Sequence, residues 1–193
     1  MQVNIKDLYL GEHHYDTVNK VEEEIAAILG EIIDYNASIK MAPKKFFEGY
    51  DFKLGDARFE LKISSNPIPW VEYARADGTD SGLSKTRADF YCFICPSKLK
   101  DGNTWVDVFK IRIVETNYLK SVMRTSTSKM VFPASQHGPG SKCFALDFKE
   151  HDHMWMGNFK CISKYVFETD GYQSSYGVTF KNNIRKIKGY ING

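Results

Sequence analysis

The run Phe90–Cys95, with the sequence FYCFIC, constrains the fold more than any other stretch of the chain. Side chains alternate between the two faces of a strand, and here apolar residues occupy both faces. A strand of this kind is typical of the centre of a sheet that is covered on both sides. The run therefore predicts a central strand with packing elements above and below it.

The periodicity of apolar residues predicts the other elements. Apolar positions spaced three and four apart indicate an amphipathic helix over residues 16–33. Alternation on either side of Gly55-Asp56 indicates a β-hairpin with strands at 50–54 and 58–64. Further elements are expected as strands at 70–73, 104–115 and 142–148, and as helices at 85–89 and 116–124. This order predicts an α/β domain with a mixed sheet flanked by helices.

Composition places the chain among ordinary globular proteins. The 193 residues are 42% hydrophobic and 26% charged, which predicts a single domain with a core at about 16–148 and an extension at about 149–193. The net charge of +2 argues against a uniformly basic nucleic-acid binder but permits a local basic face. The sequence shows no run long enough for a membrane span, no signal-peptide pattern and no disulfide framework, so we expect a cytoplasmic protein.

The second strand of the predicted hairpin carries two charged residues, although a strand that packs against a core is expected to be mostly apolar. Glu60 and Lys62 are two residues apart and so share one face, with apolar residues on the other. Burying two charges side by side is costly unless they pair or bind an ion. As a simple surface ion pair they would contribute only ~0–1 kcal/mol, and that interpretation leaves Asp51 unexplained.

Asp51, on the other arm of the hairpin, suggests that this group binds a cation. Antiparallel pairing places facing side chains about 5 Å apart, where Asp51 and Glu60 would repel each other. Mg²⁺, or Mn²⁺ as its substitute, relieves this repulsion because it takes one or two carboxylates as ligands and keeps several waters. A metal-bound water has a lowered pKa and can act as a nucleophile, and Lys62 could orient that water or stabilise charge on a phosphate oxygen.

An acidic residue, a hairpin turn and then Glu-x-Lys on the next strand resembles the motif of the PD-(D/E)XK nucleases. The motif stands here as YD at 50–51 and ELK at 60–62, with Tyr50 in place of the usual proline. The segment SGLSKTRADFYCFI at 81–94 is similar to the one that follows the catalytic strand in small phage-type members. The resemblance covers roughly residues 16–115. It implies a restriction-endonuclease-like core and a Mg²⁺-dependent deoxyribonuclease, most simply an endonuclease, which would work in the host cytoplasm if phage-encoded.

The resemblance also assigns roles to individual residues. Asp51 and Glu60 would bind the metal, with the carbonyl of Leu61 as an extra ligand, and Lys62 would act on the water or the transition state. Many members add a glutamate from the preceding helix. Glu22 is the best placed of the helix glutamates, because it lies nearest the apolar stripe.

Glu24 and Glu72 remain alternatives for that third carboxylate. Thr86 and Asp89 are expected to support the site by bonding backbone groups at turns. The groups available to contact phosphate are Ser81, Ser84, Lys85, Lys44 and Lys45.

Two other interpretations remain open. Cys92 and Cys95 have a zinc-like spacing, but residues three apart face opposite sides of a strand, so we expect buried thiols.

The same fold could also carry a Holliday-junction resolvase or a non-catalytic nucleic-acid-binding domain, since fold does not determine function. DNA is the expected partner in most of these cases, and the sequence leaves open whether the chain forms a homodimer.

Overall fold

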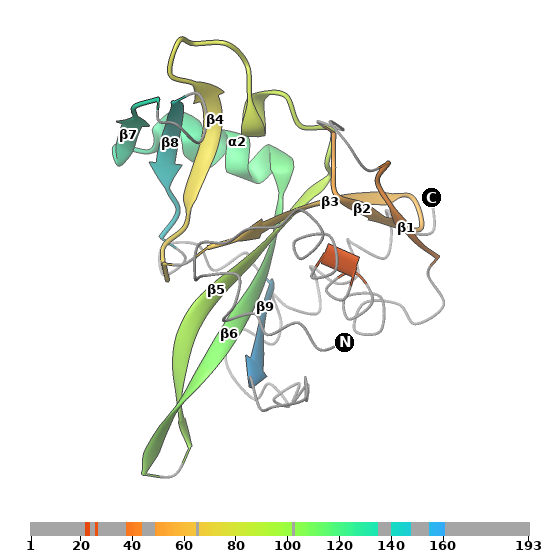
Figure 1. Ribbon diagram of the computed structural model, residues 1–193, viewed down its shortest axis with the longest axis vertical. Helices are drawn as coiled ribbons and strands as arrows, with labels where there is room; N and C mark the ends of the chain where they lie inside the picture. Colours follow the sequence, from red (N-terminus) through yellow and green to blue (C-terminus); the bar gives the residue numbers. More distant parts are fainter. Residues whose placement is uncertain are drawn as a thin grey trace.

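The protein is α/β, with a mixed central sheet and a smaller antiparallel sheet (Figure 1). This computed structural model describes residues 22–23, 26, 38–43, 49–64, 66–101, 103–134, 140–147 and 155–160, without the side chains of 96–101, 104–111 and 155–160.

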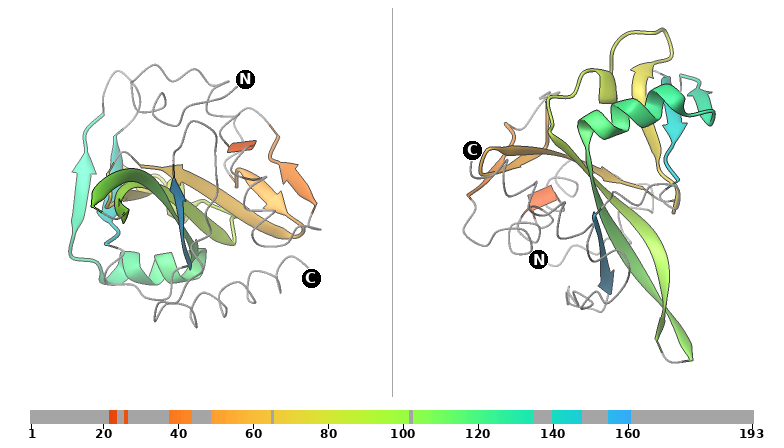
Figure 2. Two further views of the ribbon diagram at one scale, coloured as in Figure 1. Left: turned by 90° about the horizontal axis from the view of Figure 1, so that it is seen from below. Right: turned by 180° about the vertical axis from the view of Figure 1, so that it is seen from behind.

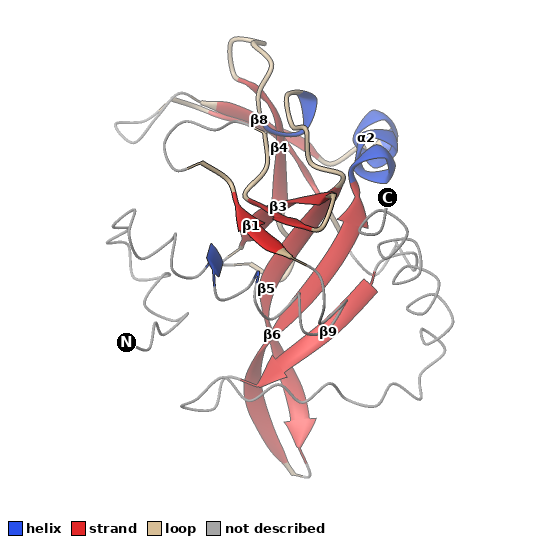
Figure 3. Cartoon of the chain, turned by 90° about the vertical axis from the view of Figure 1, so that its right-hand side faces the viewer, coloured by secondary structure: helices blue, strands red, loops and turns tan. Residues whose placement is uncertain are grey.

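The central sheet has the strand order β1-β2-β3-β5-β6-β9 (Figure 3). β3 and β5 run parallel, whereas each of the other neighbouring pairs is antiparallel, so the predicted mixed sheet is confirmed. β9 lies beyond the predicted core at 16–148, so the sheet also uses part of the expected extension. The strands are Ile39–Met41 (β1), Phe52–Leu54 (β2), Ala57–Ile63 (β3), Phe90–Asp101 (β5), Thr104–Glu115 (β6) and Trp155–Lys160 (β9).

The predicted hairpin is formed by β2 and β3. Phe52 pairs with Phe59 across the two strands, and their rings stack with centroids 5.2 Å apart. The turn contains Gly55 with a φ of 56°, a conformation that glycine adopts without steric cost. The turn and the stacked rings together fix the register, and the register sets which side chains share the outer face of the hairpin.

β5 is the central strand that the apolar run predicts. β3 pairs with one of its edges and β6 with the other. Tyr91, Phe93 and Cys95 belong to a core cluster shared with β4, β8 and the helix α2 (Thr116–Thr125). Cys92 and Ile94 are equally buried and alternate with that set, so they face the other side. Phe93 and Ile94 each contribute about 1.5–3 kcal/mol by leaving water, which anchors the sheet around β5.

A second sheet with the order β4-β8-β7 packs with α2 against one face of β5 (Figures 1 and 2). The sequence predicts two of these strands but not that they leave the central sheet. None of the helices in the described ranges is long and apolar enough to cross a membrane. The three strands are Trp70–Arg75 (β4), Lys129–Phe132 (β7) and Ser141–Ala145 (β8).

The predicted helix at 85–89 is wrong. The helical residues are instead Gly82–Ser84, a short 3-10 helix. The amides of Arg87 and Asp89 donate to the carbonyls of Gly49 and Arg58, so neighbouring segments satisfy backbone groups that a helix would use itself. Of the predicted helix at 16–33, the structure describes only 22, 23 and 26, which are helical; its other residues lie outside the described ranges.

Candidate metal centre

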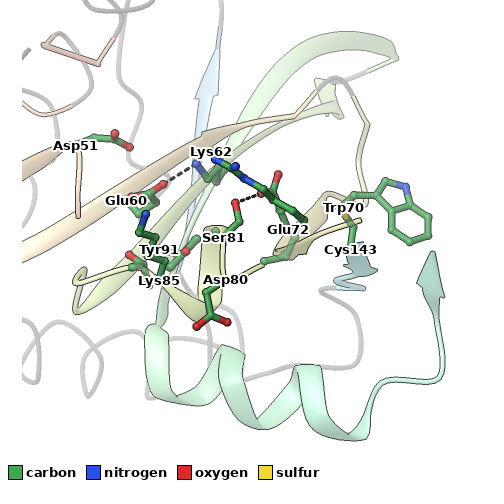
Figure 4. Close-up of a pocket in the computed structure, with 14 residues that line it drawn as sticks. Asp51, Glu60, Lys62, Trp70, Glu72, Asp80, Ser81, Lys85, Tyr91 and Cys143 are labelled. Atoms are coloured by element: carbon green, nitrogen blue, oxygen red, sulfur yellow. Dashed lines mark hydrogen bonds and ion pairs between the residues drawn. The ribbon is translucent and has the colours of Figure 1, made fainter. Parts of the chain in front are cut away.

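A pocket of about 420 Å³ opens between β3, β4 and the loop that contains the 3-10 helix (Figure 4). Asp51, Glu60 and Lys62, the three residues of the predicted motif, all line it. Asp51 lies at one end of the pocket and Trp70 at the other, with Glu72 between them (Figure 4). The structure therefore brings three of the four predicted catalytic side chains together in one pocket.

Asp51 is fixed against β3 although it precedes the first residue of β2. Its backbone amide donates to the carbonyl of Phe59 at 2.8 Å, which extends the hairpin pairing by one residue. Its carboxylate Oδ2 accepts a hydrogen bond from the amide of Leu61 at 2.6 Å. The recorded contact at Leu61 therefore involves its N–H group, and the metal-binding role of its carbonyl stays a prediction.

Glu60 and Lys62 share the pocket face of β3, as the alternation predicts. The Nζ of Lys62 lies 2.6 Å from Oε1 of Glu60, with the lysine side chain 47% exposed and the glutamate 16%. Phe59 and Leu61 are buried on the opposite face. Glu60 and Lys62 therefore form an ion pair, as the simpler interpretation expects. This pair lies at the wall of a pocket to which Asp51 adds a second carboxylate.

The electrostatics of the three groups are coupled. Burial, and then the negative charge of Glu60, raise the pKa of Asp51 to about 6, although Lys62 and the Leu61 amide act in the other direction. Burial lowers the pKa of Lys62, but Glu60 and Asp51 together outweigh it and raise that pKa above its ordinary value. Near neutral pH, Lys62 is thus an ammonium group and Asp51 is a carboxylate in a position that disfavours its charge.

The donor set fits a hard divalent cation. Asp51 and Glu60 present carboxylate oxygens to one pocket, and a positive charge between them would relieve the repulsion that raises the pKa of Asp51. In the part of the chain that the structure describes, no three Asp, Glu, His or Cys side chains enclose a metal site. A Mg²⁺ ion would therefore have these two carboxylates and several waters, which is its usual way of binding.

Glu72 is the third carboxylate at the pocket wall. It projects from β4, and its Oε1 accepts a hydrogen bond from the hydroxyl of Ser81 (Figure 4). The next residue, Gly82, has a φ of 51°, and a Cβ there would lie 2.3 Å from the carbonyl oxygen of Glu72. Only glycine allows the loop to approach β4 so closely, so Gly82 is what sets Ser81 beside Glu72.

The other predicted contacts have mixed outcomes. Glu22 is half-buried in a helical turn, and the described residues that line the pocket include Glu72 rather than Glu22. Lys85 lines the pocket, and its side chain extends toward the Glu60 side (Figure 4). Ser84 uses its hydroxyl to donate to the carbonyl of Tyr73, which makes it a support of the loop. The predicted residues that lie outside the described ranges are Glu24, Lys44 and Lys45.

Thr86 and Asp89 support the site, as predicted. The Thr86 hydroxyl accepts from the amide of Ala88 at 3.1 Å and donates to the carbonyl of Gly49 at 3.2 Å. Asp89 accepts from the amide of Arg58 at 2.9 Å, and its two oxygens also accept from the guanidinium of Arg58 at 3.0 and 2.8 Å. The bonds of Asp89 join the loop to β3 two residues before Glu60, and the bond from Thr86 joins it to Gly49. The sequence did not indicate the arginine.

Three further residues that the sequence did not predict, Tyr91, Arg75 and Trp70, also line the pocket. Tyr91, on β5, pairs in register with Glu60 and is almost fully buried. Arg75 adds a positive charge from β4, and Trp70 adds an aromatic side chain. Their strands were predicted, but the parallel register of β3 with β5 and the packing of β4 over the site depend on contacts far apart in sequence, which local patterns do not encode.

The cysteines of β5 are buried, as predicted. Cys92 and Cys95 are free thiols that are at most 1% exposed. Burial raises the pKa of Cys92, and it raises that of Cys95 to about 11, so both remain protonated. The fourth cysteine, Cys161, and the five histidines lie outside the described ranges.

Comparison of the chain with protein-family models, curated proteins and solved structures gives no match.

Proposed function

We propose that this protein is a divalent-cation-dependent nuclease that hydrolyses phosphodiester bonds in DNA with Asp51, Glu60 and Lys62, on a core of the restriction-endonuclease-like type. The observation that supports this most is the convergence of the three side chains in one pocket, together with a pKa of about 6 for Asp51. Carboxyl groups whose charge is disfavoured by burial and by a second carboxylate are concentrated at functional sites.

Asp51 and Glu60 would hold the cation. Oδ2 of Asp51 is occupied by the Leu61 amide and Oε1 of Glu60 by Lys62, so the second oxygen of each carboxylate is the one we assign to the metal. When bound, the metal would supply a water of lowered pKa and positive charge beside the phosphate. The hydrogen bonds from the backbone and Lys62 fix the two carboxylates, so little reorganisation is needed for binding.

Lys62 would stabilise the charge that develops on the phosphate. Its raised pKa keeps it protonated at neutral pH, which makes it a hydrogen-bond donor and a poor general base. Its side chain is half exposed at the pocket wall, where a phosphate oxygen can reach it. Lys85 and Arg75 line the same pocket and offer further positive charge for the neighbouring phosphates.

The test is a cleavage assay on linear, circular, single-stranded and four-way-junction DNA, with Mg²⁺ and with EDTA. We expect cleavage only with the metal, and loss of cleavage in Asp51→Asn, Glu60→Gln and Lys62→Ala. Lys53→Ala is the matched control, because Lys53 lies on the same hairpin but pairs with Asp56 outside the pocket. Equal cleavage by Lys62→Ala and the parent protein would refute the proposal.

The same assay distinguishes the alternatives. A strong preference for the four-way junction, together with a dimeric protein, would identify a resolvase. DNA binding without cleavage of any substrate in Mg²⁺ or Mn²⁺ would identify a non-catalytic domain.

A further inference from the structure

Exposed apolar side chains gather on one side of the pocket. Among the described residues, the exposed large hydrophobic side chains are Ile39, Ile68, Trp70, Met130, Val131 and Phe132. All except Ile39 belong to β4, to β7 or to the loop before β4. Isolated exposed apolar residues need no explanation. Successive residues of β7 face opposite sides, so Met130 and Phe132 share one face and Val131 lies on the other. The rings of Trp70 and Phe132 are in contact, which makes these exposed side chains a group and indicates a surface that binds something.

Two aromatic rings form the centre of this group. Trp70 is 39% exposed and Phe132 is 36% exposed, and their centroids lie 5.6 Å apart with an interplanar angle of 82°. In an edge-to-face pair the edge of one ring meets the face of the other, so ring faces remain uncovered while the pair is held in place. We call Trp70 and Phe132 the aromatic platform.

The aromatic platform is continuous with the proposed catalytic pocket. Trp70 lines that pocket at the end opposite Asp51, and its indole points outward toward β7 (Figure 4). Positive side chains accompany the aromatic ones: Arg75 is on the same strand as Trp70, and Lys129 is the exposed first residue of β7. A partner that extends from the pocket over the platform therefore meets cations, for its phosphates, and ring faces.

We propose that the aromatic platform stacks on an unpaired base of a DNA strand whose phosphodiester lies in the pocket. A stacked base needs an exposed, immobilised ring face, and its phosphates need nearby positive charge, and the surface provides both. A base inside a duplex is already stacked and cannot use the platform. The inference rests on the proposed function, and it names the substrate class as single-stranded, frayed or branched DNA.

The experiment measures DNA binding in EDTA, so that it does not depend on cleavage. A fluorescein-labelled oligothymidylate of about ten nucleotides is titrated with protein at fixed low salt and followed by anisotropy. An oligonucleotide of the same length whose central residues are abasic keeps the phosphates and removes the bases. The proteins are the parent, Trp70→Ala, Trp70→Phe, Phe132→Ala and Ile39→Ala, with circular dichroism confirming that each is folded.

Stacking predicts that Trp70→Ala weakens binding of the base-containing strand about tenfold and leaves binding of the abasic strand unchanged. Trp70→Phe should retain most of the affinity, and Phe132→Ala should reduce it. Ile39→Ala should match the parent, because Ile39 has the same kind of exposure, at 42%, outside the platform.

Equal affinity of parent and Trp70→Ala for the base-containing strand would overturn the proposal. So would an equal loss on both strands, which would indicate that Trp70 supports contacts to the sugar-phosphate backbone and does not stack on a base. Analytical sedimentation of the same proteins tests whether a second copy of the chain binds this surface instead of DNA. If the parent is a dimer, and Trp70→Ala is a monomer with unchanged DNA affinity, the surface is a dimer interface. If Trp70 contributes to base-dependent binding but the protein cleaves no DNA, the stacking proposal stands and the proposed nuclease activity is refuted.

Discussion

Two aspartates that accept hydrogen bonds from β3, Asp89 and Asp51, have pKa values shifted in opposite directions. Arg58 and Asp89 form a bidentate ion pair, and the backbone amide of Arg58 donates a third hydrogen bond to the same carboxylate. Burial opposes the charge of Asp89, but these bonds outweigh it and lower its pKa. Two residues further along the strand, Glu60 shares a pocket with Asp51, and burial together with Glu60 raises the pKa of Asp51 to about 6.

The difference separates a group that supports the fold from a group that costs stability. Asp89 is more stable as an anion in the folded protein than in water, so its charge favours folding. Asp51 is less stable as an anion when folded, so its charge opposes folding until something positive arrives. A charge that opposes folding makes physical sense where the cost is offset by a bound cation or by chemistry, which is why we place function at Asp51 and not at Asp89.

The largest expected effect is on cleavage. Asp51→Asn and Lys62→Ala should each reduce the rate of DNA hydrolysis about a thousandfold, because they remove a metal ligand and a charge that stabilises the transition state. Asp89→Asn should leave the rate of the folded fraction within about threefold of the parent's, because Asp89 does not line the pocket. Single-turnover rates at saturating Mg²⁺, corrected for folded fraction, measure both. If Asp89→Asn lowered the cleavage rate as much as Asp51→Asn does, the distinction between a supporting aspartate and a catalytic one would be wrong.

Stability should show the reverse order. Asp89→Ala should lower the free energy of unfolding by about 2 kcal/mol, because it leaves the Arg58 amide and guanidinium without their acceptor. Urea denaturation monitored by circular dichroism measures the change. Lys53→Ala, which removes an ion pair at 3.9 Å to a carboxylate that is 76% exposed, provides the control and should cost less than ~0.5 kcal/mol.

Metal affinity should depend on pH through Asp51. The carboxylate must be ionised to bind a cation, so lowering the pH from about 7 to 5, through the pKa of about 6, should weaken Mn²⁺ binding about tenfold. Titration calorimetry across this range tests the sign and the size. A carboxylate of ordinary pKa would give almost no change above about pH 5, and that flat profile would contradict the assignment.

The smallest effect is a gain in stability without metal. An acid whose pKa is raised by folding contributes stability that is present below its unfolded pKa and lost as the pH rises through its folded value, here between about pH 4 and 6. At about pH 7 in EDTA, Asp51→Asn should therefore be more stable than the parent by ~1 kcal/mol, and the difference should vanish near pH 4. Thermal unfolding at the two pH values measures it, and a destabilised Asp51→Asn would show that Asp51 supports the fold.

The sequence could predict the features of the fold that depend on local pattern. The hairpin around Gly55, β6 and α2 follow from periods of 2 and 3.6, and the central strand beginning at Phe90 follows from a run that is apolar on both faces. The pairing of β4 with β8 in a separate sheet depends on contacts between residues about 70 positions apart, and no local signal specifies them.

The candidate site divides in the same way. Asp51, Glu60 and Lys62 could be placed together because one hairpin carries them and its register follows from the turn. Glu72 could be named only as one of three candidates for a further carboxylate, and Trp70 and Arg75 could not be placed, since the loop between β4 and β5 brings these residues of β4 over β3. The unpredicted partnership of Arg58 with Asp89 explains the error at 85–89, where a helix would have removed Asp89 from β3.

The most direct test of the central claim is to locate a cation in crystals of the protein soaked in Mn²⁺, by its anomalous scattering. We predict a peak in the pocket with an oxygen of Asp51 and an oxygen of Glu60 each about 2.1 Å away, and no such peak in Asp51→Asn crystals. An empty pocket in the parent crystals at saturating Mn²⁺, with the two carboxylates still in place, would contradict it.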